Sequence, residues 1–205
     1  MKLYHQPWSP NCQKVLIAIH ELGLEGEVEI SQYNPFEERQ DWFLELNPAH
    51  KVPVFVDGGT VLWESGAICH HLADKFGRLL PEDAAARSRA LTLLYYESCN
   101  IAPTIGGEGL FGEMFRPEGE RDSAFLARMS GQLAGRLEVL GRLLADGRDY
   151  FAGSFSIADI QLYPGLSKVV ELPEPASPPA LKAWAERVGA RPAVQAVYAE
   201  VTNAG

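Results

Sequence analysis

Residues 9–12 spell Ser9-Pro10-Asn11-Cys12, between a short apolar strand and a helix from Lys14 onward. The stretch has the spacing of a Cys-x-x-Cys redox motif in which serine replaces the first cysteine. That position lies at a helix N-terminus, where unpaired N–H groups and the helix dipole stabilise an anion. The serine hydroxyl can donate a hydrogen bond to a thiolate supplied by another molecule. The stretch therefore favours a protein that uses a thiol cofactor, although Ser-Pro-Asn also caps ordinary helices.

The composition is that of an ordinary globular protein, with 205 residues, 46% of them hydrophobic and 22% charged. A formal net charge of −9 argues against binding to nucleic acid or an anionic membrane. The three cysteines, Cys12, Cys69 and Cys99, are far apart and odd in number, which indicates free thiols in a reducing compartment. We expect no signal peptide and no membrane span, and thus a cytoplasmic protein.

Short strands and helices alternate over residues 1–77. Gly23 and Gly77 each follow a helical pattern, at the position where a left-handed residue ends a helix. Asp57-Gly58-Gly59 separates two apolar runs, as in a hairpin with a glycine turn. The order βαβ followed by αββα predicts a thioredoxin-like α/β domain. The expected strands are 3–5, 28–30, 54–56 and 61–63, and the expected helices are 14–22, 37–46 and 65–76.

From Pro81 onward the sequence predicts helices and no strand. Apolar residues between Leu126 and Leu144 recur every three or four positions, which indicates a long helix with one apolar stripe. A helix from near Ser156 contains Pro164 as a kink and ends before the proline-rich stretch 173–179. Further helices are expected at 85–102, 181–188 and 192–201. The predicted organisation is a thioredoxin-like domain at 1–77, a linker at 78–84 and an all-helical domain at 85–205.

Two segments of the first domain suit a peptide-like ligand. Proline at a strand entrance removes a ladder donor, so Pro53 marks either an edge strand or a cis Val52-Pro53 bond, which would leave the Val52 backbone free to pair with an extended peptide. Ser65 is a good N-cap for the helix that follows, and it could hold a carboxylate while Glu64 holds an ammonium group. A plain serine cap is the alternative. Ser156 to Asp159 is a capping box, which we interpret as structural.

Two other clusters do not predict ligand sites. Cys69-His70-His71 with Asp74 offers metal-ligand residue types, but adjacent histidines on a helix point about a hundred degrees apart, so we expect no metal. Gly106-Gly107-Glu108-Gly109 lacks a lysine and carries a carboxylate that would repel phosphate.

Taken together, these segments resemble the glutathione transferase family over essentially the whole chain. The serine and the Asn-Pro-x-His pattern are most similar to its theta- and delta-like serine enzymes, which include many bacterial members. Gly66 departs from the delta pattern, where arginine is frequent. The matching pieces are Ser9 to Val15, Asn47 to Pro53, Trp63 to Ile68, Ser156 to Asp159 and Arg191 to Val194.

The resemblance implies a role for each matched residue of the first domain. Ser9 would stabilise the glutathione thiolate, and Val52, next to a cis Pro53, would pair with the cysteinyl backbone. Glu64 and Ser65 would hold the γ-glutamyl end. The further implied contacts are His50 and Lys51 to the glycyl carboxylate, with Gln13 or Lys14 nearby, and Asn11 beside the sulfur.

The resemblance also implies the second substrate and the partners. A hydrophobic electrophile is expected over the sulfur, and the residues placed around it by helix order are Trp8, Ile105, Phe111 and Phe115. The implied protein is a detoxifying cytoplasmic homodimer that needs glutathione and no metal. Two alternatives stay open: a glutathione-dependent disulfide or peroxide reductase that uses Ser9 and Asn11, or a transferase-like binding protein without turnover. An enzyme that uses the Cys12 thiol is a weaker option.

Overall fold

The computed structural model describes residues 1–170 and 175–203, and the chain separates into two compact units. The first unit comprises residues 1–80 and 190–205, and the second comprises residues 81–189. Residues 190–205 thus group with the first unit, whereas the sequence placed them in a domain beginning at residue 85.

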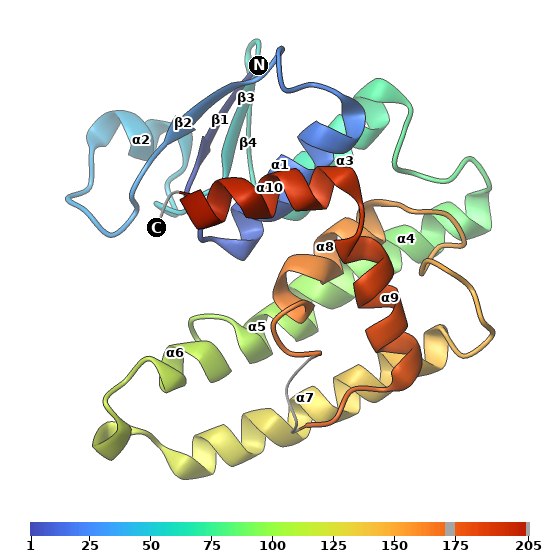
Figure 1. Ribbon diagram of the computed structural model, residues 1–205. Coiled ribbons are helices and arrows are strands. Elements are labelled where there is room, and N and C mark those ends of the chain that lie inside the picture. The colour runs from blue at the N-terminus through green and yellow to red at the C-terminus, as the bar shows by residue number, and fades with distance from the viewer. Residues whose placement is uncertain (171–174, 204–205) are drawn as a thin grey trace. The chain divides into compact units, whose positions relative to one another are not determined.

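The first unit contains a four-stranded sheet with strand order β2-β1-β3-β4 (Figure 1). β1 and β2 are parallel and are joined through a helix, and the other neighbours are antiparallel. The predicted thioredoxin-like order of elements is confirmed. The strands are β1 (Lys2–His5), β2 (Glu29–Gln32), β3 (Val54–Asp57) and β4 (Thr60–Trp63), and the helices are α1 (Pro10–Leu22), α2 (Asp41–Leu46), α3 (Ser65–Phe76) and α10 (Pro192–Asn203).

The strand register brings three loops to one edge of this sheet. Tyr4 near the end of β1 pairs with Val54 at the start of β3, and Val54 pairs in turn with Trp63 at the end of β4. The segments that follow β1, precede β3 and follow β4 therefore emerge side by side.

Glycine ends two helices of this unit as predicted. Gly23 after α1 and Gly77 after α3 adopt left-handed conformations, with φ of 75° and 62°. The expectation of a helix over 37–46 was wrong at its start, because α2 begins at Asp41. Asn34 organises a turn there instead, with its Oδ1 accepting from the Phe36 N–H at 3.1 Å.

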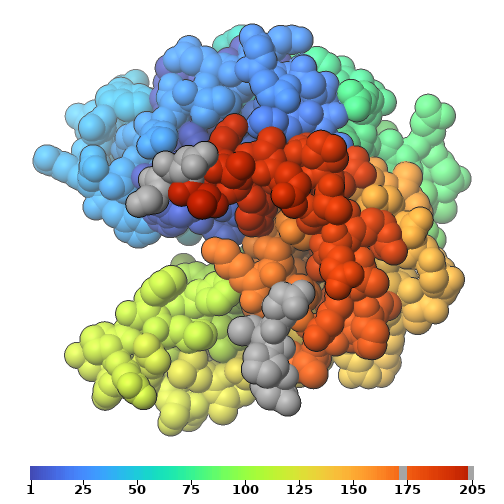
Figure 2. Space-filling view, in the orientation of Figure 1, coloured from blue at the N-terminus to red at the C-terminus, as the bar shows by residue number. Residues whose placement is uncertain are grey.

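The last helix is fixed to α1 within the first unit. The Arg191 guanidinium forms a bidentate ion pair with Glu21, with N···O distances of 2.6 and 2.7 Å. Val194 and Val197 of α10 are fully buried. In Figure 2 the red C-terminal helix lies against residues near the N-terminus, drawn in blue.

The second unit is helical, and no strand occurs in its described residues. Leu133, Leu137 and Leu140 form the buried stripe expected of the long helix. Residues 85–102 are helical, as predicted, but the helix is not uniform, since a π-helical segment follows α4 (Ala84–Tyr96). Pro103 has no N–H to continue an α-helix, and its ring excludes the normal carbonyl position four residues earlier. The elements are α4 (Ala84–Tyr96), the π segment Glu97–Ile101, α5 (Ala102–Ile105), α6 (Leu110–Met114), a 3-10 turn at Glu118–Glu120, α7 (Ser123–Leu143), α8 (Ile157–Leu166) and α9 (Pro179–Gly189).

Pro164 lies inside α8, two residues before its end. The start of the proline-rich stretch at Pro173 falls outside the described residues. α9 and α10 cover the two last predicted helices, with somewhat wider bounds.

Candidate active site

Ser9 stands at the N-cap of α1 and makes no hydrogen bond from its side chain to the helix backbone. Its backbone carbonyl accepts from the N–H groups of Cys12 and Gln13, both at 3.0 Å. Pro10 is the first helical residue, and the first turn holds no acidic side chain. The N-terminus of this thirteen-residue helix therefore offers a hydroxyl and a positive dipole end, with no carboxylate in its own first turn.

The loop before Ser9 is held in place by two buried side chains of α1. Gln13 donates from Nε2 to the Pro7 carbonyl at 2.9 Å. Cys12 Sγ accepts from the Gln6 N–H at 3.3 Å. The Ser9 N–H donates to the Gln6 carbonyl at 3.1 Å, which closes a turn. The sequence predicted for Gln13 only a contact near the ligand. Its bond to Pro7 shows that Gln13 also positions the loop before Ser9.

Cys12 is fully buried, and this burial raises the pKa of its thiol to about 11, against smaller opposing effects of the Gln6 N–H and the Ser9 hydroxyl. A buried neutral thiol is a poor nucleophile. The option of a Cys12 thiol enzyme therefore loses its chemical basis. Cys99 is the exposed cysteine of the three.

The Val52-Pro53 peptide bond is cis, as the resemblance implied. Ladder pairing of β3 begins at Val54, so Val52 lies before the sheet and next to the end of β1. Asn47 shapes this approach: its Nδ2 donates to the Lys51 carbonyl at 2.8 Å. Asn47 was not among the predicted site residues, although an Asn-Pro pair is a turn signal.

His50 is buried, 7% exposed, in a left-handed conformation with φ of 53°. Its Nε2 lies 2.9 Å from the Tyr33 hydroxyl, and its ring meets Phe43 edge-on. Lys51 beside it is exposed. The pairing with Tyr33 is a long-range contact that no local pattern in the sequence signals.

Glu64, not Ser65, is the N-cap of α3, so the expectation that Ser65 caps this helix was wrong. Glu64 has φ of 71°, a strained conformation for a residue with a side chain, and it is exposed. Ser65 is the first helical residue and is 7% exposed. The strand register places this pair at the sheet edge where β1 ends and β3 begins, since Trp63 pairs with Val54 and Val54 with Tyr4.

The four residues predicted around an electrophile differ in their surroundings. Trp8, in the first unit, is 51% exposed and stacks on Phe36 with ring centroids 5.6 Å apart. The other three belong to the second unit. Ile105 is buried against Gly165 of α8, Phe111 is half-buried, and Phe115 is 88% exposed.

The Ser156–Asp159 capping box is confirmed, and it lies in the second unit. Asp159 accepts from the Trp184 indole N–H at 2.9 Å, from two backbone N–H groups and from the Ser156 hydroxyl. Burial raises the pKa of its carboxyl to about 6, although these donors oppose the shift.

The cysteine and histidine side chains of α3 contact different partners and do not converge on one point. Cys69 lies near the Lys14 carbonyl, and His71 bonds to Asp57 at 2.9 Å. Over residues 1–170 and 175–203, no group of three or more His, Cys, Asp and Glu side chains is arranged to hold a metal ion. None of the helices described there has the length and apolar character needed to cross a membrane.

Comparison with known proteins shows which family the chain belongs to. Residues 3–82 match the family model described as glutathione S-transferase, N-terminal domain. Glutathione S-transferase 3 of Zea mays is 35% identical, over 98% of this chain and 94% of its own length. A theta class glutathione S-transferase from Xanthomonas axonopodis pv. citri, solved with glutathione bound, superposes with a TM-score of 0.84 at 28% identity and covers 95% of each chain.

The chain belongs to the glutathione S-transferase family. The similarity extends to proteins with another named activity. The disulfide-bond oxidoreductase YghU of Escherichia coli (strain K12) is 29% identical over 91% of this chain and 70% of its own length.

Proposed function

We propose that the protein binds glutathione at the sheet edge formed by Ser9, Val52-Pro53 and Glu64-Ser65, and conjugates its sulfur to a hydrophobic electrophile. The observation that carries the proposal is the Ser9 hydroxyl, which sits at the N-terminus of α1 and makes no hydrogen bond to the helix backbone. A relative with the transferase name and a similar structure with bound glutathione support it.

In this proposal each segment of the edge binds one part of glutathione. The Val52 backbone, which precedes the paired part of β3, hydrogen-bonds to the cysteinyl residue. The N-terminus of α3 binds the γ-glutamyl carboxylate at Ser65, and the Glu64 carboxylate binds its ammonium group. Lys51 and His50 lie toward the glycyl carboxylate, and Asn11 lies beside the sulfur.

The energetics of thiol activation are adequate. A free thiol with a pKa near 8.5 is about 3% ionised at pH 7, and lowering the pKa by about two units takes roughly 2.7 kcal/mol of preferential anion stabilisation. One hydrogen bond to a charged group contributes about 1.5–3 kcal/mol. A helix N-terminus adds up to about 2 kcal/mol. Ser9 and α1 together can therefore keep most of the sulfur as thiolate at neutral pH.

The conjugation step then needs no further protein nucleophile. The glutathione thiol releases its proton to solvent, and the Ser9 hydroxyl donates to the thiolate. The sulfur lone pair forms a bond to the electrophilic carbon, and the leaving group departs with the electrons of its own bond. The residues proposed to contact the electrophile are Trp8, Ile105, Phe111 and Phe115. We further propose a cytoplasmic homodimer with a detoxifying role.

Isothermal titration with glutathione tests the proposal. The Glu64→Gln variant should bind glutathione more weakly, whereas Ser9→Ala should retain most of the affinity and lose conjugation. Glu45→Gln, on the exposed surface of α2, is the matched control and should bind like the unmodified protein. Absence of saturable binding at millimolar glutathione would overturn the proposal in favour of a binding protein without turnover.

A glutathione-dependent disulfide reductase is the second candidate function. Asn11 favours it, because its side chain is exposed two residues from Ser9 and its Oδ1 accepts from Lys14 Nζ at 2.9 Å. This contact fixes the orientation of the amide, whose nitrogen can donate to a ligand. The similarity to YghU supports it as well. High turnover of a glutathione mixed disulfide with negligible conjugation of an aromatic halide would favour the reductase, and the reverse pattern would favour the transferase.

A further inference from the structure

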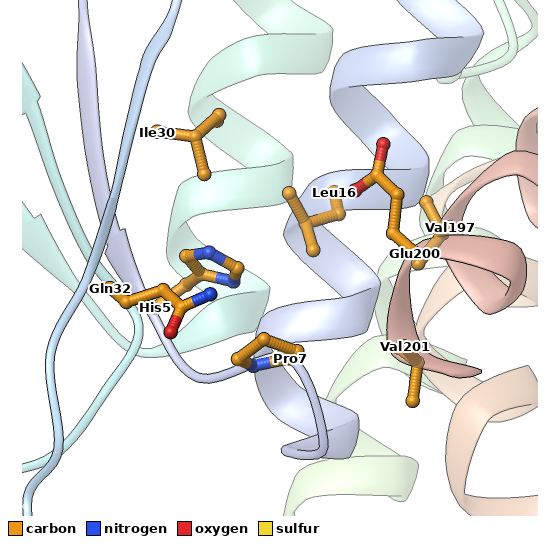
Figure 3. A pocket seen from close by; sticks show the side chains of 8 residues that line it. All are labelled: His5, Pro7, Leu16, Ile30, Gln32, Val197, Glu200 and Val201. Atoms are coloured by element: carbon orange, nitrogen blue, oxygen red, sulfur yellow. The ribbon is translucent and has the colours of Figure 1, made fainter. Parts of the chain in front are cut away.

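Tyr33 lies directly after β2, and its backbone is fixed to the sheet. It follows Gln32, the last residue of β2, whose partner in β1 is His5. Figure 3 shows the side chains of Gln32 and His5 beside a pocket of the first unit. The Tyr33 N–H donates to the His5 carbonyl at 2.9 Å. The position from which the Tyr33 side chain leaves the sheet is therefore set by the strands.

Aromatic packing fixes the directions of the Tyr33 and His50 side chains. Tyr33 is 8% exposed, and its ring stacks on Phe43 of α2 with centroids 3.6 Å apart and planes 9° apart. The His50 ring meets these two rings edge-on, with centroids 5.8 and 5.9 Å away. The His50 N–H donates to the Asn47 carbonyl at 2.9 Å, which holds the backbone as well. The imidazole is therefore held in one orientation, and its two nitrogens have different surroundings.

One nitrogen of His50 is engaged and the other is available. Nε2 lies 2.9 Å from the Tyr33 hydroxyl. Within residues 1–170 and 175–203, Nδ1 has no hydrogen-bond partner, and it is not one of the unpartnered side-chain atoms that are buried from solvent there. Nδ1 is therefore the nitrogen that a ligand can contact.

The Tyr33 hydroxyl determines which nitrogen of a neutral His50 ring carries the proton. Among the described residues, this hydroxyl has no acceptor other than Nε2. If the hydroxyl accepted from an Nε2–H group instead, its own proton would have no acceptor in a mostly buried position, which is unfavourable. Donation from the hydroxyl to Nε2 leaves the ring proton on Nδ1. A protonated ring also has an N–H at Nδ1, so Nδ1 is a donor in both forms.

We propose that Tyr33 is a positioning residue for glutathione, whose hydroxyl holds His50 in the form that donates from Nδ1 to the glycyl carboxylate. This inference rests on the proposed function, in which His50 lies toward that carboxylate, and it adds the contacting atom and the residue that prepares it. A hydrogen bond to a carboxylate is stronger than one between neutral groups, so its loss should be measurable as a loss of affinity.

The test compares two ligands by isothermal titration of the full-length protein. Glutathione contains the glycyl carboxylate, whereas γ-glutamylcysteine has no glycyl residue. Tyr33→Phe removes the hydroxyl and keeps the ring that stacks on Phe43. We expect this variant to bind glutathione about tenfold more weakly, the effect of one lost charge-assisted hydrogen bond, and to bind γ-glutamylcysteine as the unmodified protein does.

Tyr163→Phe is the matched control, because it removes one hydroxyl from a half-buried tyrosine of α8 in the second unit. It should change the affinity for neither ligand. A general loosening of the segment before β3 would weaken both ligands to the same extent in Tyr33→Phe. The difference between the two ligands therefore separates positioning of His50 from a purely structural role of Tyr33.

Nitrogen-15 NMR of the His50 ring gives a second readout, which needs no ligand. In the unmodified protein, at a pH where the ring is neutral, Nδ1 should have the chemical shift of a protonated nitrogen and Nε2 that of an unprotonated one. Tyr33→Phe should reduce this preference, because the donor to Nε2 is lost, and Tyr163→Phe should leave it unchanged. A role of Tyr33 in packing alone would not alter the tautomer.

Three results would overturn this inference alone: unchanged glutathione affinity in Tyr33→Phe, an equal loss of affinity for both ligands, or a neutral His50 ring with its proton on Nε2 in the unmodified protein. Absence of glutathione binding to the unmodified protein would overturn the proposed function and this inference with it. Far-ultraviolet circular dichroism establishes that each variant is folded. If Tyr33→Phe does not fold, the His50 tautomer of the unmodified protein decides.

Discussion

The N-terminus of α1 and the N-terminus of α8 each begin with a serine in the cap position, yet the two serines have different partners. Ser156 accepts from the Ala158 N–H at 3.3 Å, and Asp159 completes the capping box. Ser9 makes no such bond, and no acidic residue occupies the first turn of α1. Ser156 is therefore committed to the fold, and we call the N-terminus of α8 the closed end. Ser9 leaves the N-terminus of α1, the open end, able to interact with an anion.

The residue three positions into each helix explains much of the contrast. In α8 that residue is Asp159, which is buried and takes up the local N–H donors. In α1 it is Cys12, whose buried thiol accepts from the Gln6 N–H of the preceding loop and lies beside the Ser9 hydroxyl. A serine at a helix start thus predicts a ligand contact only when the first turn lacks its own acceptor.

The largest effect should come from breaking the closed end. Asp159→Ala removes the acceptor of the Trp184 indole and of three further donors, all buried, and we expect the free energy of unfolding to fall by about 3–5 kcal/mol. Urea denaturation measures it. A loss below about 1 kcal/mol would show that these donors find other partners.

At the open end, Ser9→Ala should change chemistry and leave stability intact. We expect kcat/KM for conjugation of an aromatic halide to fall roughly ten- to a hundredfold, because a charge-assisted hydrogen bond is lost. This corresponds to a loss of about 1.5–3 kcal/mol of transition-state stabilisation. The free energy of unfolding should change by less than about 0.5 kcal/mol, since no cap bond is removed. Equal losses in stability and activity would make Ser9 a structural cap.

The pH dependence of stability sharpens the account of the closed end. The folded pKa of Asp159, about 6, exceeds its ordinary value of 3.8, so the folded state holds an extra proton between these values. This contribution is full below pH 3.8 and is lost as the pH rises through 6. Its slope is at most about 1.4 kcal/mol per pH unit. Chemical denaturation across this range should show a steeper decline than in the non-titrating Asp159→Asn variant, and parallel curves would contradict the raised pKa.

The smallest effect is expected for the serine of the closed end. Ser156→Ala should lower the free energy of unfolding by about 1 kcal/mol, the usual cost of a lost N-cap. Conjugation per folded molecule should stay unchanged, in contrast with Ser9→Ala. Reduced conjugation by a fully folded Ser156→Ala variant would break the distinction between the two helix ends.

Local signals were enough to predict most of the first unit. Gly23, Gly77 and the Gly58-Gly59 turn ended their elements as expected, because left-handed and turn conformations depend on the residue itself. The strained Glu64 was not predictable in this way, since its positive φ is imposed by the surrounding fold.

The features that sequence did not predict depend on long-range packing. Tyr33 meets His50 across seventeen residues, and Arg191 meets Glu21 across the chain. The Arg191–Glu21 pair helps fix α10 to α1, and Val194 and Val197 of α10 are buried. Periodicity identified α10 as a helix but contained no information about which surface it would cover.

The most direct test of the open helix end is the pKa of the bound glutathione thiol, measured by ultraviolet absorbance of the thiolate during a pH titration. We predict a pKa about two units below the free value near 8.5 in the unmodified protein, and a return most of the way to that value in Ser9→Ala. The Ser156→Ala variant should match the unmodified protein. An unchanged thiol pKa in Ser9→Ala would contradict the assignment of the Ser9 hydroxyl as the group that stabilises the thiolate.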